Sequence, residues 1–353
     1  MSERVSEPVP ETETSRRSLR RTLERVGLGL TAALAVAMLA FIALDWLRGF
    51  PPADLLFGQF MVVGQWMDYY LGTNVFRHPF MWRAIATGVL IGVAAPLVGT
   101  YLVHRQMALI GETLAHTAFA GVAIGLVVIA FTGWTGSLLL VALVVSVIGA
   151  LGLQWLVERT NTYGDVPIAI VLSGSFAVGT LIISWGRDVI SIAISIEGFL
   201  FGSLAIVTVE GARMMAVLTV AVVAVVAITY KQLLFITFDE QAAHVAQLNV
   251  TWYNTLLIVM TAVVVVGAMQ ILGVILVAAM LVVPVAAASQ LAHSFRETLV
   301  LSICFGQLSI LGGFAFSISQ GLPPGGSIVV VAIAIYLLAI LASSRSVTAL
   351  STH

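Results

Sequence analysis

Glu112 and His116 are the two ionisable side chains of this sequence that are best placed to do chemistry together. They lie four residues apart in the stretch Gly111-Glu112-Thr113-Leu114-Ala115-His116, so on a helix they share one face. A carboxylate and an imidazole on one face are half of a typical divalent-cation site. The spacing leaves a second interpretation open, in which Glu112 caps a helix N-terminus and His116 bonds to a neighbouring helix.

A second candidate is the stretch Thr237-Phe238-Asp239-Glu240. Thr237 as N-cap and Glu240 three residues later fit a capping box, which predicts a short helix through Leu248. Asn249 then stands where left-handed backbone is tolerated. Small residues leave the surface of this helix smooth: Ala242, Ala243 and Ala246. The spacing fits a plain amphipathic connector as well as a docking helix.

The composition shows which elements must position these residues. The chain has 353 residues, of which 60% are hydrophobic and only 9% are charged, against about 25% charged residues in a soluble domain. Alternation with a period of two is absent, which argues against a membrane barrel. We therefore predict an all-α polytopic helix bundle surrounded by membrane lipids. No basic stripe follows residue 25, so a nucleic-acid partner is not expected.

Ten apolar stretches are long enough to cross a ~30 Å hydrocarbon core. They lie at about 26–44, 83–103, 112–131, 137–157, 166–185, 212–230, 253–270, 271–291, 298–318 and 327–342. Five clustered arginines before the first stretch predict a cytoplasmic N-terminus, and ten spans then return the C-terminus to the cytoplasm. This predicts a multi-pass protein of the plasma membrane. Four arginines fall near the outer face against this rule: Arg77, Arg83, Arg187 and Arg213.

Several segments are not plain spans. Residues 45–80 are rich in Trp, Tyr and Phe, which predicts a helix at the membrane interface. Residues 197–211 are apolar, too short to span and interrupted by glycine, which predicts a half-helix near the outer mouth. Pro96 and Pro284 are expected to kink their spans. The polar residues 1–25 are expected to be disordered.

The single lysine, Lys231, excludes one source of energy from this chain. A P-loop needs Gly-x-x-x-x-Gly-Lys-(Ser/Thr), and Lys231 stands between Tyr230 and Gln232. If ATP hydrolysis drives the activity of this protein, we expect it on a separate polypeptide. The sequence has no Ser/His/Asp grouping either, so we expect no enzymatic activity and no permanently bound cofactor.

Three segments resemble one known family. The stretch from Ala95 to Gly125 is similar to the membrane subunit of the ABC-type zinc, manganese and iron importers, often called ABC-3. That family has a Gly-(Asp/Glu)-x-Leu-(Ala/Ser)-His signature, which corresponds to Gly111–His116. Phe199–Ser203 resembles the family's Leu-Phe-Gly segment, and Gly273–Leu291 resembles its later apolar motif that ends in proline. The resemblance extends over about residues 76–345.

The resemblance implies a type II ABC importer-like permease fold and a homodimer around a central path. It also implies a separate ABC ATPase, an extracytoplasmic metal-binding protein and a divalent cargo of zinc, manganese or iron. Glu112 and His116 take the positions of the acid and histidine of the signature, so two-fold symmetry would assemble four ligands. Aspartate is common in the family where this chain has Glu112, and Leu172–Ser175 lacks a histidine that some zinc importers carry.

By the same resemblance, the segment after Phe238 is the coupling loop that docks into the ATPase. Its expected contact residues are Thr237, Asp239, Glu240, Ala242, Ala243 and Ala246. The family's loop usually ends near a glycine, where this chain has Asn249.

We expect four parts in this chain: a disordered cytoplasmic tail at 1–25, an added span with an interfacial connector at 26–82, the permease domain at 83–345 and a cytoplasmic tail at 346–353. Two alternatives remain open. A permease of the same architecture for a chelated metal or vitamin would not need the ligands Glu112 and His116. A secondary cation transporter would be expected to carry more intramembrane acids.

Overall fold

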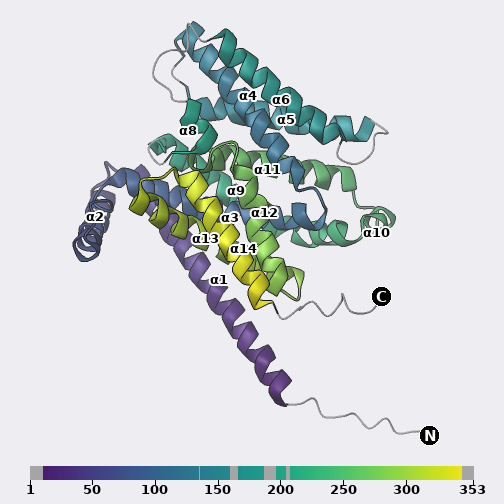
Figure 1. Cartoon of the computed structure of the whole chain (residues 1–353), viewed down its shortest axis with the longest axis horizontal. Coiled ribbons are helices and arrows are strands. Elements are labelled where there is room, and N and C mark those ends of the chain that lie inside the picture. The colour runs from purple at the N-terminus through teal and green to yellow at the C-terminus, as the bar shows by residue number, and fades with distance from the viewer. Residues whose placement is uncertain (1–10, 135, 160–165, 187–195, 204–206, 344–353) are drawn as a thin grey trace.

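The computed structural model describes residues 11–134, 136–159, 166–186, 196–203 and 207–343, and within them all regular structure is helical (Figure 1). The helices are α1 (Glu11–Trp46), α2 (Pro51–Leu71), α3 (Pro79–His104), α4 (Leu109–Thr132), α5 (Leu138–Arg159), α6 (Val166–Trp185), α8 (Ile196–Phe201), α9 (Val209–Phe238), α10 (Glu240–Val245), α11 (Val250–Leu272), α12 (Val277–Leu291), α13 (Phe295–Gln320) and α14 (Pro324–Ala342). The predicted all-α bundle is confirmed.

Nine of the described helices are long and apolar enough to span a membrane, and α12 is a shorter apolar helix of 15 residues. The ten predicted stretches each fall on one of these ten helices. Helix α1 extends back to Glu11, so the structure describes part of the expected disordered tail as helix, while residues 1–10 lie outside the described ranges. Pro96 and Pro284 lie inside α3 and α12, and each helix continues on both sides of its proline.

Helix α12 starts later than predicted because the chain turns at Gly273. This glycine has a φ of 79°, in the left-handed region that disfavours other residues, and a Cβ there would overlap the carbonyl of Leu200 in α8. The Ile275 N–H donates to that same carbonyl at 3.4 Å. The predicted half-helix at 197–211 thus contributes α8, which packs against the α11–α12 turn, while residues 204–206 lie outside the described part.

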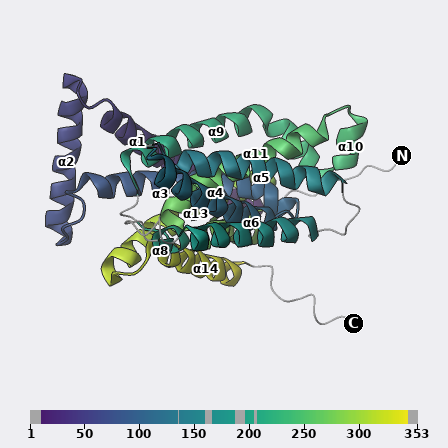
Figure 2. The same ribbon diagram turned by 90° about the horizontal axis from the view of Figure 1, so that it is seen from above.

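The bundle has two ends that differ in structure. At the end that includes α10, Arg105 in the α3–α4 turn forms an ion pair with Glu240 of α10. The hydroxyl of Ser343, after α14, donates to the carbonyl of Gln290 in α12 at 3.0 Å. Figure 2 shows α2 at the opposite end, running across the direction of the long helices. We call these the α10 end and the α2 end.

Helices α3 and α11 form the centre of the bundle. Their apolar windows are 89% and 78% buried, against 28% for α5 and 17% for α6. Helix α4 packs against both α5 and α6 and also against α11. The helix with Glu112 and His116 therefore lies between the core and two peripheral helices whose outer faces remain exposed.

Gly99 permits the close approach of α3 to α12. A Cβ at this position would overlap the backbone carbonyl of Leu281, which a side-chain rotation cannot relieve. We expect Gly99→Ala to lower the thermal unfolding midpoint of the detergent-solubilised protein, since overpacking costs about 1–3 kcal/mol. Gly152→Ala is the matched control, because nothing lies within 4 Å of the added Cβ. Equal midpoints for the two variants would contradict this packing.

Two of the four arginines near the predicted outer face have buried acidic partners. The Arg83 guanidinium donates to both carboxylate oxygens of Asp45, from Nε at 2.9 Å and from a terminal nitrogen at 3.2 Å. Arg77 Nε lies 3.5 Å from Asp68 Oδ2. These carboxylates neutralise the arginines locally, which explains why their positions depart from the charge rule.

Asp68 organises the connection from α2 to α3. Its Oδ1 accepts from the Thr73 hydroxyl at 2.8 Å and from the Val75 and Phe76 N–H groups at 2.9 Å, and its Oδ2 accepts from the Arg77 N–H at 2.8 Å. Burial alone would raise the pKa of Asp68, but these hydrogen bonds together hold the pKa below its usual range.

We expect Asp68→Asn to accelerate amide hydrogen exchange in residues 73–77, because the amide cannot accept at both of its positions. In the wild-type chain the lowered pKa means that the carboxylate contributes fully above about pH 4 and loses its effect as the pH falls further. Exchange rates that are the same in Asp68→Asn and in the wild type at pH 7 would contradict this role.

Candidate metal path and coupling helix

Glu112 and His116 lie in the first two turns of α4, which begins at Leu109. Both side chains are half-buried in the single chain, while their neighbours Thr113 and Leu114 are buried. The helix is continuous through both positions, so the spacing of four places them one turn apart on one face. The predicted pair is thus brought together by local helix geometry alone.

The imidazole of His116 faces the peripheral helix α6. Its ring lies edge-on to Phe176 with 5.0 Å between centroids, and Phe176 is 41% exposed. At the next residue of α4, the Thr117 hydroxyl lies 3.1 Å from that of Ser175. His116 Nδ1 is buried, and the described residues offer it no hydrogen-bond partner. This nitrogen is therefore available to a ligand.

One chain supplies only part of a ligand set. Among the described residues, no group of three or more His, Cys, Asp or Glu side chains could hold a metal ion. Glu112 and His116 provide one oxygen donor group and one nitrogen donor group, and tetrahedral sites for transition metals use four ligands. The segment from Leu172 to Ser175 in α6 carries hydroxyl groups but no imidazole.

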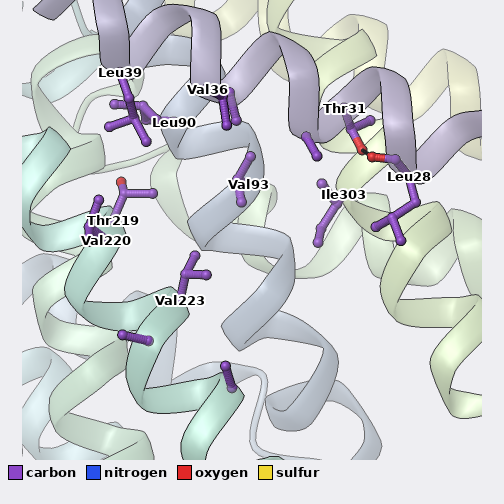
Figure 3. A pocket seen from close by; sticks show the side chains of 14 residues that line it. Leu28, Thr31, Val36, Leu39, Leu90, Val93, Thr219, Val220, Val223 and Ile303 are labelled. Atoms are coloured by element: carbon purple, nitrogen blue, oxygen red, sulfur yellow. Dashed lines mark hydrogen bonds between the residues drawn. The ribbon is translucent and has the colours of Figure 1, made fainter.

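An apolar cleft of about 450 Å³ lies elsewhere, between α1, α3, α9 and α13 (Figure 3). Its walls are aliphatic side chains and the threonines Thr31 and Thr219. The Thr31 hydroxyl already donates to the carbonyls of Gly27 at 2.9 Å and Leu28 at 3.1 Å. This lining has no carboxylate, imidazole or thiol, so it does not resemble a path for a metal cation.

The predicted capping box is wrong in one residue. Helix α9 continues to Phe238, and the Thr237 hydroxyl donates back to the Leu233 carbonyl at 2.6 Å, so Thr237 is not an N-cap. The N-cap of α10 is Asp239, whose Oδ1 accepts from the Ala242 N–H at 2.8 Å. Aspartate caps a helix at least as well as threonine. The helix of the preceding span continues to Phe238, about two turns beyond the predicted end at residue 230.

The end of the short helix also differs from the prediction. Helix α10 ends at Val245 rather than Leu248, and the left-handed residue is Gln247, with a φ of 60°. Asn249 has a φ of −77° and instead caps α11, with its side-chain oxygen accepting from the Trp252 N–H at 3.1 Å. Asn serves equally well at an N-cap and in a left-handed turn, so its type alone did not distinguish the two.

The three alanines of α10 are not equivalent. Ala243 is fully buried in a small cluster with Ile236 and Val250, so it holds α10 against α9 and α11 and is not part of the outer surface as expected. Ala242 is half-buried and Ala246 is exposed. The exposed surface of α10 also includes Val245, which is 82% exposed.

Glu240 joins α10 to the turn that precedes α4. Its carboxylate lies 3.5 Å from the guanidinium of Arg105, and that guanidinium donates to the Asn254 side-chain oxygen at 2.7 Å. The Asn254 amide donates back to Glu240 at 3.4 Å. The Arg105 side chain is only 7% exposed. Burial lowers the pKa of Arg105, and Glu240 opposes that shift. We call these three residues the Arg105 clamp.

Arg105 and Asn254 are functional candidates that the motif analysis did not single out. The sequence places them 149 residues apart, and only the fold brings both to Glu240. The one sequence signal was the arginine directly after the α3 span, seven residues before Glu112.

The sequence of this chain is similar to those of known membrane transport proteins. The sequence model of the ABC 3 transport family matches residues 77–343. The manganese transport system membrane protein MntC of Listeria monocytogenes is 29% identical over 268 residues, covering 76% of this chain and 92% of that protein. A probable metal transport system membrane protein of Treponema pallidum is 32% identical over 264 residues, covering 75% and 96%.

Among solved structures, PsaBC from Streptococcus pneumoniae in complex with Fab superposes with a TM-score of 0.66 at 27% identity, covering 75% of this chain and 92% of that one. The likeness confirms the predicted permease fold. The family match begins at residue 77, after α2 has ended. This chain belongs to the ABC 3 transport family.

Proposed function

We propose that this chain is the permease subunit of an ATP-driven importer of a divalent transition metal, zinc, manganese or iron. The observation that carries the proposal is the pair Glu112 and His116 on one half-buried face of α4, with a buried imidazole nitrogen that has no partner among the described residues. Several relatives are named for manganese, which makes manganese the first cation to test.

A homodimer would complete the ligand set. A two-fold axis beside α4 would bring together two carboxylates and two imidazoles, a set that suits Mn²⁺ or Zn²⁺. The exposed outer faces of α5 and α6, next to this pair, leave surface for such an interface. The site has to bind weakly or transiently, since transport requires release at the far side.

The α10 end would be cytoplasmic, with both termini on that side of the plasma membrane, and α10 would dock into a separate ABC ATPase. The Arg105 clamp supports a direct route for coupling, because a displacement of α10 would act through Arg105 on the turn that leads into α4 and Glu112. An extracytoplasmic metal-binding protein would deliver the cation at the α2 end.

Uptake of radioactive manganese, zinc and iron by cells that express this chain with a partner ATPase and a metal-binding protein tests the proposal. We expect uptake of at least one free cation, its loss when the P-loop lysine of the ATPase is replaced, and its persistence when a protonophore collapses the ion gradient. Uptake that survives without the ATPase but stops with the protonophore would favour a secondary transporter. Uptake of a chelated metal alone would favour the chelate permease.

A further inference from the structure

Helix α2 is confined to the surface of the membrane by the spans on either side. Helix α1 ends at Trp46 and α2 begins at Pro51, so the connection cannot exceed roughly 17 Å even when fully extended. Figure 2 shows α2 lying across the ends of the long helices rather than continuing their direction. A helix in this position runs along the boundary between hydrocarbon and water.

The rotation of α2 about its own axis is fixed by its contacts. Phe57 and Phe60 pack on Phe41 of α1, with ring centroids 5.7 and 4.9 Å from that of Phe41. Phe60 also packs on Trp82 of α3, with centroids 4.6 Å apart. Asp68, on the same side, is held by the α2–α3 turn. The remaining circumference of α2 therefore always faces the same surroundings.

That exposed circumference has two chemically different sides. Successive residues are rotated by about 100° around the helix axis, and in this projection the larger side is apolar and aromatic. Its main members are Leu55, Leu56, Val62, Val63, Trp66 and Tyr70, Gln59 is a polar member, and the exposed Tyr69 lies at its border with the other side. We call this the α2 apolar face. The narrower side carries Asp54, Gly58 and Gln65. Trp66 and Tyr70 stack with centroids 6.0 Å apart.

We infer that α2 lies in the interfacial layer of the lipid bilayer at the α2 end, with the α2 apolar face on the acyl chains and the Asp54 side in water. This is the outer leaflet if the proposed orientation holds. Trp and Tyr favour this layer because their rings are amphipathic. The α2 apolar face carries no charge, so its attachment needs no anionic lipid and is insensitive to salt. The inference does not depend on the transported cargo.

Spin labels on the full chain in nanodiscs of phosphatidylcholine test this arrangement. Labels are placed at Leu55, Val62, Gly58 and Gln65, one at a time in a Cys304→Ala background. We expect the first two to collide more with oxygen than with a water-soluble nickel chelate, and the last two to show the reverse. References are Leu30, on the exposed side of α1 in its span, and Gln241, on α10.

If labels on both sides of α2 were as accessible to the nickel chelate as the label at Gln241, α2 would be surrounded by water, and the inference would be overturned. Exclusion of both reagents from the α2 apolar face would also overturn it, in favour of cover by a second copy or another protein.

A matched pair of variants gives an independent test. Val62→Asp is expected to increase the collisions of the label at Leu55 with the nickel chelate, whereas Gln65→Asp is expected to leave them unchanged. Equal responses to the two aspartates, or none to either, would refute lipid contact on one side only.

Discussion

Glu112→Ala and His116→Ala are each expected to lower metal uptake by at least about tenfold, because loss of even an outer-sphere partner of a metal costs about 10- to 100-fold in affinity. Glu112→Asp is expected to retain much of the uptake, since it keeps the carboxylate and shortens it by one methylene. The double alanine variant is not expected to multiply the two losses, because both residues serve one site. Initial rates of radioactive metal uptake measure these effects.

Matched controls lie at the α10 end. Glu158 and His293 are exposed, and Glu158 bonds to Gln154 in its own helix. Glu158→Ala and His293→Ala are expected to leave uptake near the wild-type rate. If the alanine variants at Glu112 and His116 imported metal as fast as these controls, while all four proteins were equally abundant and folded, the pair would have no place in the metal path.

Breaking the Arg105 clamp is expected to separate ATP hydrolysis from transport. Glu240→Ala removes the carboxylate that links α10 to Arg105, so motion of α10 would no longer reach the start of α4. We expect metal uptake to fall about fivefold or more, which corresponds to the lower end of typical coupling free energies. ATP hydrolysis by the complex is expected to continue. The ratio of ATP hydrolysed to metal imported is the measured quantity.

Charge exchange distinguishes coupling from simple loss of structure. The double variant Arg105→Glu with Glu240→Arg is expected to recover part of the uptake lost in either single variant, since the ion pair is restored with opposite polarity. The exchange removes the hydrogen bond that Arg105 donates to the Asn254 side-chain oxygen, so recovery is expected to be incomplete. A normal ratio of hydrolysis to uptake in Glu240→Ala would rule out the coupling role of the clamp.

Local pattern was enough to predict the spans and the pair on α4. A span is an apolar run of fixed length, and two residues four apart on a helix share a face whatever surrounds them. The same local reasoning predicted a short helix after α9 but misassigned its cap, because Thr237 and Asp239 are both good caps and only the true end of α9 decides between them.

Contacts between distant segments could not be read from the sequence. Ala243 looked like surface because alanine is small, yet it is buried against Ile236 and Val250. The late start of α12 depends on α8 packing against Gly273, some 70 residues away in the chain. The position of Arg83 departs from the charge rule in the sequence alone, and only the fold brings Asp45 to it as a partner.

The most direct test of the proposed metal path is simultaneous measurement of metal import and ATP hydrolysis in proteoliposomes that contain this chain, the proposed partner ATPase and the proposed metal-binding protein. The wild-type complex is expected to import manganese only when ATP is supplied to the ATPase. The Glu112→Ala/His116→Ala complex is expected to hydrolyse ATP but to import none above background. Import by the double variant at the wild-type rate would contradict the assignment of these two residues to the metal path.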